Sequence, residues 1–335
     1  VDNSIYDSPK SYPPSLVENL GVSHCRGYPI LTLAIYPIQY KPALGKISYY
    51  KDVSIKINLE EIENIHPLFR GKPTDKQYIQ TLICNPSITE EYNEITVSKP
   101  RSSFGIADPS DNYDYVIITN ENLNNTAGTY NWDDLLAQKQ AKGLTATKVT
   151  VEQIDNTPDY WNNTAVYNDS QCHIREFIKE AYLNWETDYI LLGGDWDATD
   201  QIVPFRMFYD DQYSNEQIPS DYYFNHLDGN FNEDADNYWA ESNGDDDVPG
   251  STDVDLLSEL FIGRALVDNE TQVSNFVKKT IWYENCVEKD FLEKAPFFGG
   301  NLGWSITSDA YMEEVRNGTG VFHHHHGSTP PQPSG

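Results

Sequence analysis

Short apolar runs separated by turn-forming residues dominate the first part of the chain. Apolar residues adjoin or alternate with polar ones through Ile30–Ile38 and again through Val53–Leu59. Between these runs lie Pro42 and Gly45, within the sequence PALGK, and both residue types favour turns. Runs of this length and composition are typical of β-strands joined as a hairpin. We therefore expect residues 1–98 to be all-β, with a sandwich-like arrangement.

The pattern changes after Asp111, where strand-like apolar runs alternate with stretches whose apolar residues recur every three or four positions. Near-continuous apolar runs are typical of buried parallel strands, and the longer spacing is typical of amphipathic helices. Their alternation predicts an α/β domain whose mostly parallel sheet is flanked by helices. The predicted strands are Tyr115–Thr119, Thr145–Val151, Tyr189–Leu192, Leu260–Ile262 and Pro296–Phe298, and the predicted helices are Trp132–Lys142, Ile174–Trp185 and Thr271–Asn285. Ligands of open α/β sheets gather at the carboxyl ends of strands, where Asp195, Asp197 and Arg264 fall.

A polar segment between the two patterns predicts a domain boundary. It contains Lys99, Arg101 and several Ser, Pro and Gly residues. For a chain of 335 residues two domains are the expectation. We therefore predict a β-rich domain over 1–98, a linker over 99–111 and an α/β domain over 112–335. An exposed linker of this kind is also where a protease would cut.

The formal net charge of -29, from 23 Lys and Arg against 52 Asp and Glu residues, excludes several classes of partner. Nucleic acids and anionic membranes attract clusters of Lys and Arg, so we expect neither as a partner. No apolar run approaches the roughly 18 residues that a membrane span requires.

The start of the chain and its glycosylation sequons favour secretion. The first residue is Val1, as expected of a mature chain whose targeting segment has been removed. Asn-X-Ser/Thr sequons mark surface loops of secreted proteins, although Asn-rich chains also contain them by chance. They occur at Asn124, Asn162, Asn168, Asn269 and Asn317. We expect an extracellular protein.

The segment from Asp228 to Asp255 contains ten acidic residues and no Lys or Arg. Ca²⁺ takes 6 to 8 oxygen ligands, and Asp alternating with Asn lets one loop supply several of them. The spacing differs from that of an EF-hand loop. We expect a structural Ca²⁺ site, with a merely solvated acidic loop as the alternative. The candidate ligands are Asp228, Asn230, Asn232, Asp234, Asp236, Asp245 and Asp247.

The four cysteines, Cys25, Cys84, Cys172 and Cys286, are widely spaced and form no CxxC pair. This cysteine pattern predicts no zinc site. A disulfide between Cys25 and Cys84 is left open, because it depends on a geometry that the sequence does not define.

Several segments occur in an order that resembles a known family. They are RGYPILTLAIYPIQYKPALGKISYYKDVSIKI, YDYVIITNENL, WDDLLAQKQAKGLTATKV, REFIKEAYLNWETDYILLGGDWD, IPSDYY and LFIGR. In this order they resemble the gingipain family of cysteine peptidases, in which a pro-domain precedes a caspase-like catalytic domain. The resemblance extends over nearly the whole chain, to about Asn317. It implies a secreted endopeptidase acting on proteins or peptides, with residues 1–98 as a pro-domain that covers the active site and inhibits it.

The implied mechanism needs a Cys nucleophile, a His that holds it as thiolate and protonates the leaving amine, and an acidic residue that orients the imidazole. The family's Gly-His-Gly-Ser turn is matched near the end of the chain, which makes His326 the base, although His325 stands where the family has Gly. The family's Cys follows the His, and no Cys follows His326. We therefore expect a catalytic domain that is cut short before its nucleophile. The four consecutive histidines can equally be the remnant of a purification tag.

Two carboxylates match positions of the family's site. Asp221, in SDYY, falls where the family has the residue that orients the His, or else it is a calcium ligand or a loop cap. Asp255 matches a position in the specificity pocket of arginine-cleaving members, where it would pair with a basic substrate side chain, or else it completes the acidic loop. Arg70 and Lys72, in LFRGKP, are candidates for pro-domain side chains that fill this pocket.

A second hypothesis keeps the predicted fold but assigns the chain no catalytic activity. Because residues 1–335 lack the family's nucleophile, the chain can also be a catalytically inactive, calcium-stabilised homologue that acts as a binding or scaffold protein. A Cys encoded beyond His326 distinguishes the two hypotheses.

Overall fold

The computed structural model describes residues 3–58, 65–94, 105–197, 201–210, 216–241, 257–286, 290–291, 294 and 312. The chain divides into two compact units, Val1–Ile281 and Trp282–Gly335. In the second unit, the rings of Trp282 and Phe291 stack with centroids 6.3 Å apart. Within the described ranges, no helix is both long and apolar enough to cross a membrane.

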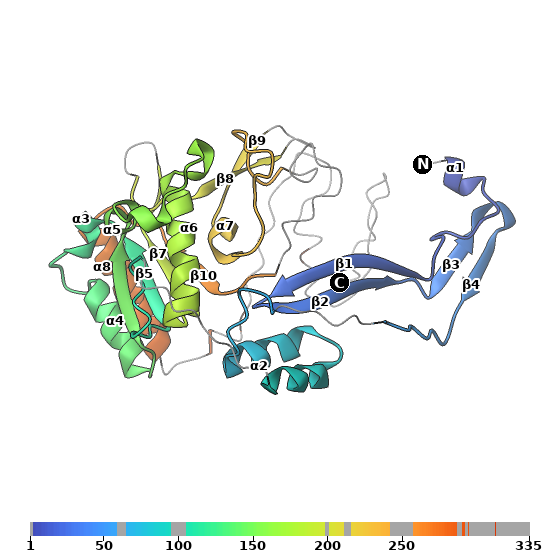
Figure 1. Ribbon diagram of the computed structural model, residues 1–335, viewed down its shortest axis with the longest axis horizontal. Helices are drawn as coiled ribbons and strands as arrows, with labels where there is room; N and C mark the ends of the chain where they lie inside the picture. Colours follow the sequence, from blue (N-terminus) through green and yellow to red (C-terminus); the bar gives the residue numbers. More distant parts are fainter. Residues whose placement is uncertain are drawn as a thin grey trace, which may run out of the picture. The chain divides into compact units, whose positions relative to one another are not determined.

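A four-stranded parallel sheet forms the core of the first unit, in the order β10-β7-β5-β6 (Figure 1). The strands are β5 (Tyr115–Thr119), β6 (Ala146–Thr150), β7 (Tyr189–Gly193) and β10 (Phe261–Ala265). The central strands β5 and β7 are apolar and almost fully buried, as expected of parallel strands covered on both faces. The predicted α/β domain with a parallel sheet is confirmed.

Helices flank this sheet (Figure 1). The long helices are α4 (Trp132–Ala141), α6 (Ser170–Glu180) and α8 (Glu270–Asn285), and the short ones are α3 (Glu121–Asn124), α5 (Val151–Asp155) and α7 (Tyr222–Asn225). Polar side chains cap the first turns of α3, α4, α5 and α6. Asn131 accepts hydrogen bonds from two N–H groups of α4, and Asp169 accepts one from Cys172 of α6. The connections β5 to β6 and β6 to β7 cross the sheet in opposite directions, so right-handed crossovers place α4 and α6 on opposite faces.

The N-terminal segment contains two separate antiparallel strand pairs. They are β1 (Val17–Cys25) with β2 (Tyr28–Ile35), and β3 (Ile38–Lys41) with β4 (Lys46–Tyr49); a short helix, α1 (Asn3–Tyr6), precedes them. The predicted hairpin turn at PALGK is confirmed, but it joins β3 to β4 and not the two predicted apolar runs. The predicted second strand over Val53–Leu59 is wrong for its described part, 53–58, which forms no strand. Gly45, whose φ is 58°, ends the turn, and β4 begins at the next residue, Lys46, which pairs with Lys41 of β3.

The expectation that residues 1–98 are all-β is corrected by a helix, α2 (Pro73–Leu82). Pro73 opens the helix, where a missing N–H costs nothing, and Asp75 lies in its first turn. The described residues of this segment form no sandwich, since each strand pair is a two-stranded sheet. A small core of Cys25, Tyr28, Phe69 and Ile79 joins the β1–β2 hairpin to α2.

An antiparallel hairpin and a cluster of buried aromatic residues pack against the first half of the acidic segment. The hairpin is β8 (Arg206–Asp210) with β9 (Glu216–Ser220). Tyr223, Phe231 and Trp239 are buried, and the Arg206 guanidinium lies 3.8 Å from the Trp239 ring centroid. These contacts order residues 226–241.

Most predicted elements after Asp111 agree with the structure to within a few residues. The exceptions are elements outside the described residues, namely the strand Pro296–Phe298 and most of the linker 99–111. The domain boundary in that linker stays a prediction.

Candidate active site

The carboxyl edge of the parallel sheet brings together the ends of β7 and β10. β7 ends at Gly193 and is followed by Gly194 and Asp195, and Arg264 is the fourth residue of β10. A Cβ at Gly194 would lie 2.1 Å from Cγ2 of Ile202, so the close packing of this edge requires glycine. Sites of open α/β sheets form at this edge.

Arg264 holds three segments of this edge together. Its Nη1 donates to the carbonyls of Gly194 at 2.8 Å and Val203 at 2.5 Å, and its Nη2 donates to that of Pro204 at 3.1 Å. Its Nε and Nη2 also donate to the two carboxylate oxygens of Asp221, at 2.8 and 2.6 Å. The planar fork of arginine matches a carboxylate in this two-point manner.

Asp221, predicted to orient the catalytic imidazole, therefore forms an ion pair with Arg264. Both of its oxygens accept hydrogen bonds, and the pair fixes the SDYY segment beside the sheet edge. An ionised carboxylate can accept more than one hydrogen bond per oxygen, so this ion pair is compatible with a further imidazole partner.

Two carboxylates meet at the same edge. Asp195 lies beside Asp268, and its own backbone N–H donates to the carbonyl of Val267 at 3.3 Å. Burial, followed by the hydrogen bond and negative charge of Asp268, raises the pKa of Asp195 to about 6. Such a carboxyl exchanges a proton near neutral pH, as an acid or base in a site must.

Cys172 lacks the surroundings of a nucleophile. Its thiol is buried, 3.3 Å from the hydroxyl of Tyr223 and 3.3 Å from Nη2 of Arg206. Burial, together with the charge of Asp169, raises the pKa of the Cys172 thiol to about 11. The neighbouring His173 bonds through its two ring nitrogens to Asp155 and Asn168, each at 2.9 Å. The thiol is therefore protonated at neutral pH and is not paired with this imidazole.

The other three cysteines form no disulfide. Cys25 is buried, Cys84 is exposed and Cys286 is intermediate. The Sγ of Cys25 lies 3.6 Å from the carbonyl oxygen of Ser258. The disulfide between Cys25 and Cys84 that the sequence left open is not formed.

The predicted calcium ligands separate into two groups. Asp234 and Asp236 lie with Glu241 in one cluster whose carboxylate oxygens are within 4.8 Å of one another. The amide oxygen of Asn232 accepts from the N–H of Asp236 at 3.0 Å, and that of Asn230 accepts from the N–H of Asn232 at 3.2 Å, so both amides order the loop. Asp228 faces histidines instead.

Arg70 and Lys72 do not fill a pocket at the carboxyl edge of the sheet. Both bind Asp188, the residue before β7, at the opposite, amino end of that strand. Arg70 donates to Asp188 at 2.9 Å and to both oxygens of Asp75 at 2.9 and 2.6 Å, and Lys72 donates to Asp188 at 2.7 Å. They join the N-terminal segment to the α/β part by buried ion pairs.

Four predicted site residues, His326, Asp255, Asp245 and Asp247, lie outside the described residues. The sequence reasoning missed Asp268, which follows β10 by only three residues and could have been found as a further carboxylate at a strand end. It also missed the histidines beside Asp228, of which His66 is distant in sequence and His226 is only two residues away.

Comparison with known proteins identifies the family. The profile of peptidase family C25 matches residues 108–326, a range that includes the sheet and ends at His326. A search of curated proteins finds no match. Among solved structures, dimeric latent PorU from Porphyromonas gingivalis is similar with a TM-score of 0.38 and 18% identity, covering 61% of this chain and 18% of the PorU chain. Because the family profile matches more than half of its residues, this chain belongs to peptidase family C25, the gingipain family.

Proposed function

We propose that the protein is a secreted cysteine endopeptidase of gingipain type in a latent form. The family match over residues 108–326 carries the proposal, because it extends to the candidate base His326. In the proposed mechanism a thiolate attacks the scissile carbonyl, and the imidazole of His326 accepts the thiol proton and delivers it to the leaving amine.

The nucleophile in this proposal is none of Cys25, Cys84, Cys172 and Cys286. Cys172 is buried, its pKa is raised to about 11, and the adjacent imidazole is engaged elsewhere. Cys25 is buried against the carbonyl of Ser258. Cys84 follows α2 and Cys286 follows α8, so both precede His326 in the chain, whereas the family's nucleophile follows its His.

Asp221 is proposed to orient His326 while it remains paired with Arg264. The two-point ion pair with Arg264 fixes the carboxylate in position, which is what an orienting residue needs. We propose Asp255 as the carboxylate of the specificity pocket, selecting substrates with a basic side chain.

Latency is proposed to come from the N-terminal segment. Its buried ion pairs with Asp188 support this role, because they hold residues 70–75 against the α/β part. Cleavage within 99–111 would separate the two parts of the chain and activate the enzyme.

Expression of the protein from its complete gene tests the proposal. Peptides with an internal arginine should be hydrolysed after cleavage in the linker, and His326→Ala should lower kcat/KM by at least about a thousandfold. Cys172→Ser is the matched control and should retain activity. If the complete, processed protein hydrolyses no peptide, the inactive homologue is the better account.

We further propose a structural Ca²⁺ at Asp234, Asp236 and Glu241. Three carboxylates gathered on an ordered loop suit this hard cation, which prefers oxygen ligands. Added Ca²⁺ should raise the melting temperature, and Asp234→Asn should reduce that rise. A melting temperature that is unchanged by Ca²⁺ and by chelator would show that the loop is only solvated.

A further inference from the structure

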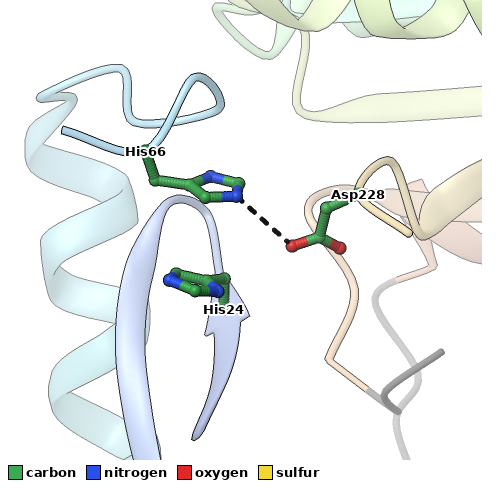
Figure 2. Close-up of side chains that lie close together, drawn as sticks. All are labelled: His24, His66 and Asp228. Carbon is green, nitrogen blue, oxygen red and sulfur yellow. Dashed lines mark ion pairs between the residues drawn. The ribbon is translucent and has the colours of Figure 1, made fainter. Parts of the chain in front are cut away.

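Three segments that are far apart in sequence bring His24, His66 and Asp228 together. His24 is the second-last residue of β1, His66 lies before α2, and Asp228 follows α7. One potential ligand atom from each lies within 4.8 Å of the other two. Figure 2 shows the two imidazole rings lying one above the other beside the Asp228 carboxylate. All three side chains are partly buried.

The spacing of these atoms is close to that of ligands around one metal ion. Nε2 of His66 and Oδ2 of Asp228 are 3.8 Å apart, which is too long for a direct hydrogen bond. Ligand atoms bound at about 2.0–2.2 Å to a tetrahedral Zn²⁺ are about 3.3–3.5 Å from each other. A movement of a few tenths of an ångström would therefore bring the two atoms to coordination distance.

Hydrogen bonds from Arg175 to main-chain carbonyls hold Asp228 in this position. Nη2 of Arg175, on α6, donates to the carbonyls of Asp228 at 2.9 Å and Gly229 at 3.1 Å. The same nitrogen donates to the carbonyl of His226 at 2.7 Å. Rigid supports of this kind place a ligand side chain before the metal arrives.

The two histidines are held by their own segments. His24 lies in the β1–β2 ladder opposite Pro29, and Nδ1 of His66 accepts the N–H of Leu68 at 3.3 Å. The rings stack with centroids 4.4 Å apart and planes 15° from parallel. Because the lone pairs lie in the ring planes, one ring must turn about its broad, weakly restricted χ2 angle to bind the same ion.

The ligand types select the class of metal. Imidazole nitrogens suit Zn²⁺, Cu²⁺ and Ni²⁺, whereas Ca²⁺ takes oxygen ligands, so this set differs from the predicted calcium site. Metals bind the uncharged form of imidazole.

We propose that His24, His66 and Asp228 bind a single divalent transition-metal ion, with Zn²⁺ as the representative, in a site that contains no cysteine. Binding through Nε2 of His66 requires the tautomer with its proton on Nδ1, so the long hydrogen bond from the N–H of Leu68 to Nδ1 is lost. The ion fastens the β1–β2 hairpin and the segment before α2 to the loop after α7. This inference is independent of the proposed peptidase activity.

The test uses the full chain with His323–His326 replaced by Ala, because that histidine tract binds the same metals. Titration of this protein with ZnCl₂ in a calorimeter should show one equivalent bound. His24→Gln and Asp228→Asn should each weaken binding at least about tenfold. Glu233→Gln is the control, since it removes an exposed carboxylate from the same loop outside both groups of candidate ligands and should leave Zn²⁺ affinity unchanged.

A second measurement needs no further variant. X-ray absorption of the Zn²⁺-loaded protein should show a shell of nitrogen and oxygen with two imidazoles and no sulfur. Absence of binding, sulfur in the first shell, or unchanged affinity in both His24→Gln and Asp228→Asn would each overturn the proposal.

Discussion

At the scale of single residues, the carboxyl of Asp195 has a pKa raised to about 6, next to Asp268. The ordinary pKa of an aspartate is about 3.9, so folding favours the protonated form. This contribution to stability is fully present below pH ~4 and is lost as the pH rises through about 6. The carboxyl edge of the sheet should therefore lose some stability as Asp195 ionises.

We expect Asp195→Asn to become more stable, relative to the unsubstituted protein, as the pH rises from about 4 to 7. Asparagine occupies the same space and does not ionise beside Asp268. Urea unfolding at the two pH values measures the difference in the free energy of unfolding.

Asp108→Asn is the control for this measurement. Hydrogen bonds from the backbone and side chain of Ser110 lower the pKa of Asp108, so its contribution to stability is present above its ordinary pKa and is lost as the pH falls. Its relative stability should therefore change in the opposite direction, and changes of the same sign in the two variants would contradict our account of Asp195.

The buried thiol of Cys172 gives a second prediction at this scale. Iodoacetamide at pH 7.5 should modify the exposed Cys84 first and Cys172 only after denaturant is added, because the thiolate is the reactive form. Mass spectrometry of the peptides measures both rates. Modification of Cys172 in the folded protein as fast as that of Cys84 would show that the thiol is activated after all.

At the scale of elements, Arg264 links β7, β10 and the segment before α7. Lysine cannot reproduce its two-point contact with Asp221 and its three bonds to carbonyls. We expect Arg264→Lys to lower the free energy of unfolding by about 2–4 kcal/mol, measured in urea.

Lys294→Met is the comparison for Arg264→Lys. The ion pair of Lys294 with Asp290 is exposed, and its loss should change stability by no more than about 1 kcal/mol. Equal effects of the two substitutions would mean that the contacts of Arg264 do not stabilise the sheet edge.

The elements that the sequence predicted well are those whose burial pattern is unambiguous. β5 and β7 are apolar throughout because both faces of the sheet are covered, and α4 is bounded by a polar cap and Gly143. The segment 53–58 has an apolar content like that of a strand, but pairing depends on partners elsewhere in the fold. α2 was missed because its short amphipathic pattern lies in a segment read as β-rich.

The candidate site was also only partly predictable, because part of it depends on partners elsewhere in the fold. Asp195 and Arg264 could be placed at strand ends from the sequence, since the ends of parallel strands share one edge. The ion pair of Arg264 with Asp221 and the approach of His24 and His66 to Asp228 depend on how distant segments pack. No local sequence pattern encodes such contacts.

At the scale of the whole molecule, buried ion pairs connect the N-terminal segment to the α/β part. Arg70 is fully buried and bonds to Asp75 and Asp188, and its guanidinium lies 3.8 Å from the ring centroid of Tyr182. Removing one member of such a network leaves buried charges without compensation, which costs about 3–5 kcal/mol.

We therefore expect Arg70→Met to loosen the N-terminal segment. Hydrogen exchange in α2 and β1 should accelerate more than in β5, because the α/β core does not depend on this contact. Lys76→Met, which removes an ion pair with the exposed Glu90, is the matched control and should have little effect. Unchanged exchange in Arg70→Met would exclude this network as the anchor of the segment.

The central proposal is that this member of peptidase family C25 acts through a cysteine thiolate that is none of Cys25, Cys84, Cys172 and Cys286. The most direct measurement is labelling of the activated protein, expressed from its complete gene, with an arginyl acyloxymethyl ketone that alkylates active-site thiolates, followed by mapping of the modified residue by mass spectrometry. We predict a single modified cysteine that is none of Cys25, Cys84, Cys172 and Cys286, and loss of labelling in His326→Ala. Labelling of one of those four residues, or no labelling at all, would contradict the account.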